Sequence, residues 1–165
     1  MPGDTDLTGA VTHLLYQEAA CLDEQRWDDW LALFDRDVEY WLPAWDSEHE
    51  TTRDPGNEVS LMYYNGRSGL EDRVFRLRTG RSSASTPLPR TCHMVSNIMV
   101  SPSADGTCAV KANWVTHLYR AGESTHYFGR YEYLLVPAGG GWRIAKKKIL
   151  LLNDYIVTVL DIYSV

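Results

Sequence analysis

A thiol and an imidazole stand side by side in the segment "PRTCHMVSN", as Cys92 and His93. Cysteine and histidine are common zinc ligands, and an imidazole beside a thiol can activate it as a nucleophile. The surrounding residues have the character of a β-strand, in which successive side chains point to opposite faces of the sheet. Cys92 and His93 therefore cannot converge on one ion unless a bulge intervenes, and their adjacency predicts no metal site.

His93 shares its predicted strand face with the residues at two-residue spacing, Thr91, Val95 and Asn97. An imidazole and an amide on one face of a curved sheet can line a pocket, so His93 and Asn97 are candidate pocket residues. A hydrogen-bonded histidine that is buried or lies at an interface explains the same pattern. Both interpretations stay open at the level of the sequence.

The remaining histidines and cysteines have no recognised ligand spacing, since the sequence contains neither HExxH nor CxxC. His117 and His126 lie on neighbouring predicted strands, where a chance cross-strand pair is the simpler interpretation. The 3 cysteines are widely spaced, which suits reduced thiols better than a disulfide framework. The "AGGGW" segment precedes a strand, whereas a phosphate-binding loop leads into a helix.

Charge is unevenly distributed along the chain. Residues 18–58 hold 13 acidic and 3 basic residues, whereas residues 67–90 hold 6 arginines and 2 acidic residues. Arginine is enriched at protein interfaces because its planar guanidinium can bind a carboxylate at two points. We expect Arg73 and Arg76 to share an exposed helix side. The candidate subunit-interface residues, for which a solvated helix face is the alternative, are Arg67, Arg73, Arg76, Arg78, Arg81 and Arg90.

Apolar residues at helical spacing predict helices at about residues 8–24, 26–34 and 68–80. Thr8 is the expected N-cap of the first helix. In the third helix, Ser68 and Glu71 predict a capping box and Gly80 predicts the C-terminal end. The apolar stripe expected to face the sheet consists of Leu70, Val74 and Leu77.

Runs of β-type residues predict strands at about residues 38–42, 91–100, 107–120, 124–136 and 142–152. Residues 44–66 lack periodicity and are expected to form a loop. Short, turn-rich connections predict that strands adjacent in sequence pair antiparallel. Helices followed by a meander indicate one α+β domain, residues 1–165, in which the helices cover one face of a curved antiparallel sheet.

The composition excludes several classes of partner. The net charge is −6 and the isoelectric point is near 5.3, whereas nucleic acids and anionic membranes favour clustered positive charge. We therefore expect neither as a partner. The sequence shows no signal peptide and no run of about 18 apolar residues, so a cytoplasmic location is expected.

Four segments together resemble the small (β) subunit of aromatic-ring-hydroxylating dioxygenases, and the benzoate, toluate and anthranilate enzymes in particular. They are "LLYQEAACLDEQRWDDWLALFDRDVEYWLPAWDSE", "SLMYYNGRSGLEDRVFRLRTGRSSAS", "HMVSNI" and "KKKILLLNDYIVTVLDIY". The most specific motifs are "GLEDRVFRLRT" and "NDYIV", and the resemblance extends from about residue 13 to the end. It implies a cone-shaped α+β fold like that of nuclear transport factor 2, also called SnoaL-like.

The resemblance also implies a function. In this family the small subunit joins a large (α) subunit in a three-plus-three hexamer and self-associates as a trimer. The large subunit carries the Rieske two-iron cluster and the mononuclear Fe(II), and an NADH-dependent reductase supplies it with electrons. The implied reaction dihydroxylates a benzoate-like aromatic acid. The resemblance assigns no catalytic, cofactor-binding or metal-binding residue to this chain.

Two other classes of function remain as alternatives. The first is a self-sufficient isomerase or dehydratase of the same cone fold that uses His93. It would need a carboxylate of raised pKa facing the histidine in an apolar pocket. The second alternative is a small-molecule binding module. Both would be functional without a partner subunit.

Overall fold

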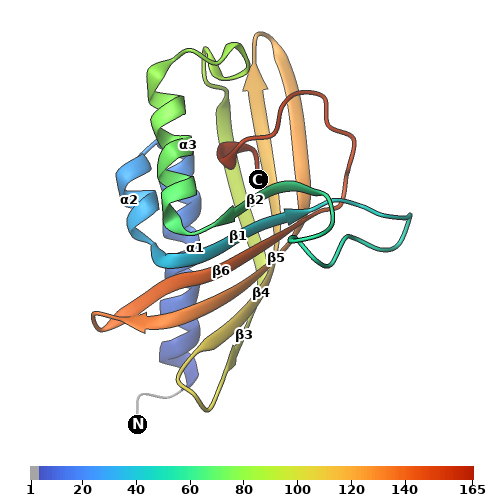
Figure 1. The fold of residues 1–165 in the computed structure, drawn as a ribbon. Coiled ribbons are helices and arrows are strands. Elements are labelled where there is room, and N and C mark those ends of the chain that lie inside the picture. The colour runs from blue at the N-terminus through green and yellow to red at the C-terminus, as the bar shows by residue number, and fades with distance from the viewer. Residues whose placement is uncertain (1–3) are drawn as a thin grey trace.

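The computed structural model describes residues 4–165, except for the side chains of residues 4, 5 and 84. The helices are α1 (Asp4–Asp23), α2 (Trp27–Ala32) and α3 (Arg67–Thr79), with short 3-10 turns η1 (Ser83–Ser85) and η2 (Ile162–Ser164) (Figure 1). The strands are β1 (Phe34–Pro43), β2 (Ser60–Asn65), β3 (Arg90–Pro102), β4 (Cys108–Arg120), β5 (Glu123–Ala138) and β6 (Gly141–Leu151). None of the described helices is both long and apolar enough to cross a membrane.

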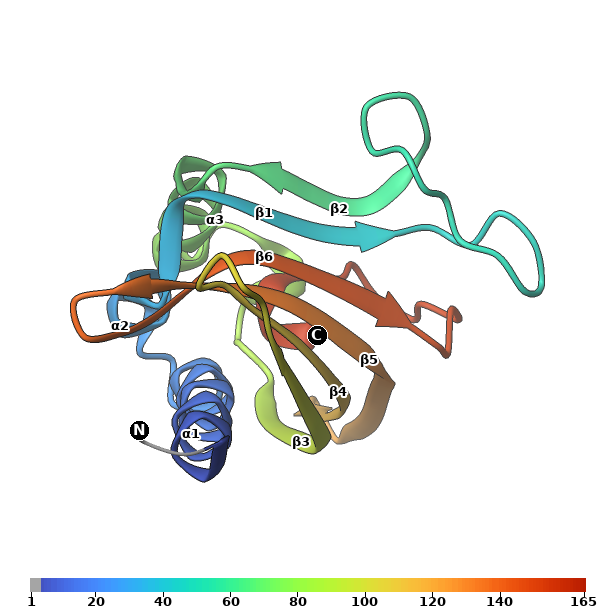
Figure 2. The same ribbon diagram turned by 90° about the horizontal axis from the view of Figure 1, so that it is seen from below.

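The strands form one curved sheet in the order β2-β1-β6-β5-β4-β3 (Figure 2). The meander from β3 to β6 pairs antiparallel, as predicted from its short turns. The sheet is mixed and not purely antiparallel, because β1 lies parallel to β6. This pairing joins strands about a hundred residues apart, which local periodicity does not encode. The α+β class and the curved sheet are confirmed.

The helices pack against the sheet through apolar stripes. Helix α1 lies along β3, and α3 contacts β1, β2 and α2. Leu70, Val74 and Leu77 of α3 are buried, as their spacing predicted. Where α2 meets β1, Trp30 and Phe34 pack edge to face with ring centroids 4.8 Å apart, and such pairs contribute about 0.5–1.5 kcal/mol beyond their buried area.

Two predicted N-terminal helix caps are wrong. Helix α1 begins at Asp4, so Thr8 lies inside it and is no N-cap. Helix α3 begins at Arg67 after Gly66, so Ser68 falls within the first turn and no side chain caps the helix. Glu71 pairs instead with Arg67, at 3.1 Å. The predicted C-terminal end is correct, because Gly80 adopts a left-handed conformation with φ of 63°.

The predicted loop at residues 44–66 contains a strand. Residues 60–65 form β2, an edge strand that pairs with β1 and places Tyr64 opposite Tyr40. A short apolar run at a sheet edge has little periodicity of its own, which explains why it was missed. The second helix is also shorter than predicted, because Phe34 already belongs to β1. The remaining loop, residues 44–59, projects from the body of the molecule (Figure 1, Figure 2).

Candidate functional site

His93 lies on the inward face of β3 and is hydrogen-bonded on both sides of its ring. Nδ1 is 2.6 Å from Oδ1 of Asp23, the last residue of α1. The main-chain N–H of His93 and the hydroxyl of Thr91 donate to the same carboxylate, at 2.9 Å each. Nε2 lies 3.3 Å from the main-chain oxygen of Val165. The histidine thus links α1, β3 and the C-terminal segment.

A carboxylate at Nδ1 orients an imidazole, as in general-base pairs. Burial alone would raise the pKa of Asp23, but hydrogen bonds from His93 outweigh it and hold the pKa below its ordinary value of 3.8. Nε2, which would have to meet a substrate, faces Val165 instead, and the His93 side chain is only 2% exposed. The geometry therefore matches a buried, hydrogen-bonded histidine and offers a substrate no access.

The Asp23 carboxylate should contribute to stability at neutral pH and lose its effect in acid. A carboxyl group whose pKa is lowered by folding stabilises the folded state above its ordinary pKa, and the contribution disappears as the pH falls through the lowered value. We expect Asp23→Asn to lower the unfolding free energy by about 1.5–3 kcal/mol at pH 7. Urea unfolding should show the variant and the wild type converging below about pH 4.

The neighbouring Glu24 is exposed and provides the control for Asp23. Among the described residues its carboxylate pairs with the exposed Arg26 alone, and such pairs contribute about 0–1 kcal/mol. Glu24→Gln should therefore be close to wild type at both pH values. If Asp23→Asn lowered the unfolding free energy equally at both pH values, the carboxylate charge would not be what stabilises the contact with His93.

Asn97 does not join His93, so this candidate pair is a wrong prediction. The pairing register between β3 and β4 shifts between Ser96 and Met99, and Asn97 takes a left-handed φ of 54°. A bulge of this kind reverses which face a side chain occupies. Asn97 is exposed on the outer face of the sheet, where it lines a hollow with Lys111 and Arg130.

Cys92 and His93 lie on opposite faces of β3, as predicted, with Cys92 exposed. On the outer face, Cys92 lies opposite His117, which lies opposite His126 with the imidazole centroids 6.1 Å apart. These side chains form a row across three strands and do not converge on a point. Within residues 4–165, no group of three or more His, Cys, Asp or Glu side chains could hold a metal ion.

The interior holds a buried ion pair that the sequence reasoning missed. Nζ of Lys147 on β6 lies 2.9 Å from Oε2 of Glu18 on α1, and both side chains are at most 3% exposed. The indole N–H of Trp30 and the hydroxyl of Tyr133 also donate to this carboxylate, at 3.2 and 2.7 Å. The ring of Tyr131 lies 4.3 Å from Nζ, a cation–π contact.

Desolvation lowers the pKa of Lys147, although the adjacent Glu18 carboxylate opposes the shift. Burial raises the pKa of Tyr131 and Tyr133, so both phenols are neutral at physiological pH. Because these side chains are buried away from solvent, the cluster stabilises the fold and does not meet a substrate. A sequence signal existed: Glu18 stands one turn after Leu14 and Leu15 and one turn before Leu22, on the apolar side of its helix.

The C-terminal segment closes the cone. Residues 162–165 are buried, and the C-terminus lies inside the curl of the sheet (Figure 2). Asp161 is bound by the guanidinium of Arg73 on α3, with Nε 2.8 Å from Oδ1. The hydroxyls of Tyr163 and Ser85 are 2.9 Å apart. The segment therefore occupies interior space that an open cone would offer to a ligand.

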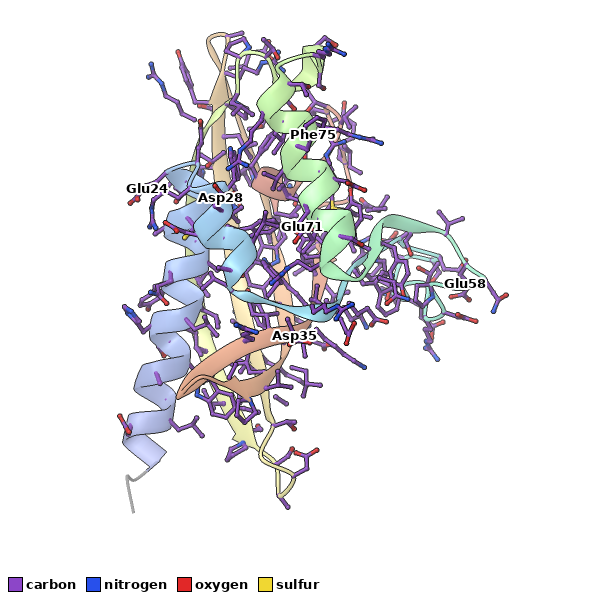
Figure 3. The ribbon with its side chains drawn as sticks, turned by 60° about the vertical axis from the view of Figure 1, so that its left-hand side comes forward. Glu24, Asp28, Asp35, Glu58, Glu71 and Phe75 are labelled. Carbon is purple, nitrogen blue, oxygen red and sulfur yellow. The ribbon has the colours of Figure 1, made fainter. Side chains whose placement is uncertain are left out.

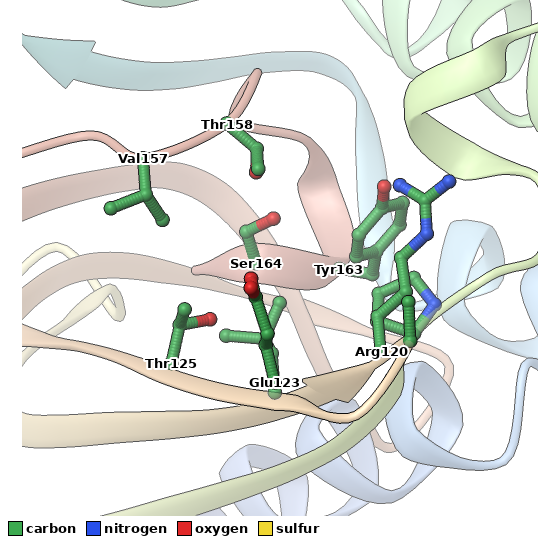
Figure 4. A pocket seen from close by; sticks show the side chains of 10 residues that line it. Arg120, Glu123, Thr125, Val157, Thr158, Tyr163 and Ser164 are labelled. Carbon is green, nitrogen blue, oxygen red and sulfur yellow. The ribbon is translucent and has the colours of Figure 1, made fainter.

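A cavity of about 300 Å³ remains at the mouth, between the β4–β5 turn and the C-terminal segment (Figure 4). Its lining includes Thr125, Thr158 and Ser164. Arg120 reaches the same region, but its guanidinium donates to the main-chain oxygens of Ser83 and Thr86, at 2.7 and 2.9 Å. The cavity thus combines hydroxyls, apolar surface and the charged residues Arg120 and Glu123. Neither His93 nor Lys147 lines it.

The six candidate arginines lie in different environments. Arg73 contacts Asp161 and does not share an exposed side with Arg76, so that prediction is wrong. Arg78 pairs with Asp28 at 2.9 Å, and Arg67 with Glu71 at 3.1 Å. The guanidinium of Arg90 lies 5.9 Å from the centre of the Tyr119 ring. Arg76 and Arg81 are exposed, and their side chains form no ion pair or hydrogen bond within the described residues.

A curved sheet covered by helices on its inner face and closed by its own C-terminal segment defines the class of protein. It is the cone-shaped nuclear transport factor 2-like fold, as expected from the sequence resemblance. The interior of this cone is filled, whereas the outer face of the sheet and the loop at residues 44–59 are exposed.

Comparison with known proteins identifies the family. The family model "Ring hydroxylating beta subunit" matches residues 17–158. The chain is 44% identical to the β subunit of toluate 1,2-dioxygenase from Pseudomonas putida, over 94% of this chain and 96% of that protein. It is also 44% identical to the β subunit of benzoate 1,2-dioxygenase from Acinetobacter baylyi, over 98% of this chain and 96% of that protein.

The solved β subunit of benzoate 1,2-dioxygenase from Burkholderia mallei superposes with a TM-score of 0.78 at 37% identity, covering 94% of this chain and 95% of that one. The chain therefore belongs to the family of ring-hydroxylating dioxygenase β subunits.

Proposed function

We propose that this chain is the non-catalytic small subunit of the terminal oxygenase component of an NADH-dependent aromatic-ring dioxygenase. It assembles with a large subunit in a three-plus-three hexamer in the cytoplasm. The large subunit holds the Rieske cluster and the mononuclear iron, and a reductase passes electrons to it. The reaction adds both atoms of O₂ to the ring of a benzoate-like acid and consumes two electrons and two protons, giving a cis-dihydrodiol.

Membership of the β-subunit family is the observation that carries this proposal, because the matches span nearly the whole chain. The environment of His93 supports the non-catalytic role. Both ring nitrogens face protein groups, Asp23 and Val165, and the side chain is out of solvent. A stand-alone isomerase or dehydratase would need that imidazole to meet a substrate.

We expect His93→Ala to impair folding or assembly more than turnover. Loss of the histidine removes hydrogen bonds that contribute about 0.5–1.5 kcal/mol each, whereas loss of a catalytic base costs about a hundredfold or more in rate. The measurement is turnover of a benzoate-type substrate per intact complex, after co-expression with the large subunit. Turnover within about threefold of wild type is expected.

His117→Ala is the control, because His117 is exposed on the outer face of the sheet. It should match the wild type in stability. A hundredfold lower turnover in fully assembled His93→Ala complexes would overturn the non-catalytic assignment and favour a catalytic histidine.

Arg76 and Arg81 belong to the same proposal as candidate contacts with the large subunit. Both side chains are exposed and form no ion pair with another described residue. The other candidate arginines, Arg67, Arg73, Arg78 and Arg90, already contact groups of their own chain.

A further inference from the structure

The outer face of the sheet carries a band of basic side chains. Lys111 on β4 and Lys148 on β6 flank Glu132 on β5 in one row across the sheet. Lys146 lies in the next row towards the β5–β6 turn, and Arg130 lies in the row on the other side. We call Lys111, Arg130, Lys146 and Lys148 the basic sheet face. Glu39 and Glu132 lie among these four bases. Because the bases outnumber the two acidic residues, the local charge is positive.

The basic sheet face is hollowed and partly apolar. One hollow of about 490 Å³ is lined by Trp41, Lys111, Lys146 and Lys148 among others, and a second of about 370 Å³ shares Lys111 with it. Met99 at the edge of the second hollow is 68% exposed. A hollow with an apolar floor and a charged rim is typical of a protein interface.

The loop of residues 44–59 carries the opposite charge, and we call it the acidic arm. It holds five carboxylates against one base: Asp46, Glu48, Glu50, Asp54 and Glu58 against Arg53. All five acidic residues are exposed. Figure 3 shows Glu58 on the part of the chain that stands away from the helices.

The acidic arm has a defined conformation. The indole N–H of Trp45 donates to the main-chain oxygen of Leu151 at 2.7 Å, which ties the base of the arm to the end of β6. Thr52 bonds Ala44 and Val59 across the arm, and Glu58 accepts the N–H of Asp54 at 2.9 Å. An ordered arm loses little conformational entropy on binding, which favours its use as a docking element.

The two charged surfaces do not satisfy each other within one chain. Among the described residues, the only ion pair of the acidic arm is Arg53 with Glu50, inside the arm itself. Lys111, Lys146 and Arg130 make no ion pair in the part of the chain that the structure describes. Each surface therefore carries an excess of charge, negative on the acidic arm and positive on the basic sheet face.

We propose that the acidic arm of one copy of this chain docks on the basic sheet face of the next copy. This inference rests on the proposed function, since it names the contact that joins the small subunits. Two different patches on each copy make a head-to-tail contact, and contacts of that kind close into a ring when the rotation between copies allows closure. The exposed Val59 and Leu61 at the base of the arm supply apolar surface for the hollow floor. Charge complementarity fixes the register of the contact.

Charge reversal with rescue tests the docking. The arm variant is Asp46→Lys/Glu48→Lys, two carboxylates that accept no side-chain or main-chain hydrogen bond among the described residues. The sheet variant is Lys111→Glu/Lys146→Glu. Each alone should shift small-subunit association to at least about tenfold higher protein concentration, since like charges then face each other. A third variant carrying both reversals should regain association.

Arg76→Glu/Arg81→Glu is the control for the sheet variant in the chain alone, because it makes the same charge change on the α3 side, and there it should leave small-subunit association unchanged. In the co-expressed complex this variant tests the proposed contact with the large subunit and is not a control for the docking. Sedimentation of each chain, alone and co-expressed with the large subunit, is the measurement, and circular dichroism verifies folding. Unchanged sedimentation of both single-surface variants would overturn the inference. So would failure of the folded doubly reversed chain to regain association.

Failure of the proposed function has a different signature. In that case the wild-type chain itself would not co-purify with the large subunit. A wild-type complex that assembles, with arm and sheet variants that assemble equally well, would refute only the docking contact.

Discussion

Lys147→Met should lower the free energy of unfolding of the isolated chain by about 3–5 kcal/mol, one of the two largest effects that we expect from a single substitution. The change leaves the Glu18 carboxylate buried without its cation, and a buried charge that loses its partner is strongly destabilising. Trp30 and Tyr133 would still donate to the carboxylate but would not neutralise it. Urea unfolding followed by circular dichroism measures the loss.

The three consecutive lysines provide a matched control. Lys146 precedes Lys147 and is exposed on the outer face, so Lys146→Met should change stability by no more than about 0.5 kcal/mol. Combining Lys147→Met with Glu18→Gln removes both charges and should recover a large part of the loss, because neighbouring sites are energetically coupled. Equal losses in Lys146→Met and Lys147→Met would contradict the buried pair.

Arg73→Ala should release the C-terminal segment and destabilise the chain by about 3–5 kcal/mol. The substitution leaves the carboxylate of Asp161, only 1% exposed, without its guanidinium partner. Residues 162–165 fill the interior next to this pair, so their contacts with His93 and Ser85 should weaken as well. Hydrogen exchange of the amides of residues 161–165 should rise together with the loss of unfolding free energy.

Arg76 is the control, because it lies on the same helix, is exposed and forms no ion pair or side-chain hydrogen bond among the described residues. Arg76→Ala should leave both exchange and stability near wild type, within about 0.5 kcal/mol. If Arg73→Ala left exchange at residues 161–165 unchanged, the Arg73–Asp161 pair would not be what holds the segment in place.

Local patterns explain which parts of the fold were predictable. The stripe of Leu70, Val74 and Leu77 and the end of α3 at Gly80 follow from helical periodicity and glycine conformation, and both are present. The antiparallel meander follows from short turns between long β-type runs. These signals act within a few residues, so a single sequence displays them.

The errors concern contacts between distant segments or a special backbone geometry. The parallel pairing of β1 with β6 and the Glu18–Lys147 pair join residues more than 100 positions apart. Asn97 lies on the opposite face of β3 from His93 because of a bulge. No glycine in the sequence marks the position of this bulge. The prediction that Arg73 lies on an exposed helix side was wrong because its partner, Asp161, belongs to the distant C-terminal segment. The local helix pattern does not reveal that contact.

Native mass spectrometry of this chain co-expressed with its large subunit tests the central claim most directly. We expect one complex with three copies of each subunit, in which the iron remains with the large subunit when the complex is dissociated. Recovery of this chain as a separate species that turns over substrate or retains about one iron per chain would contradict it.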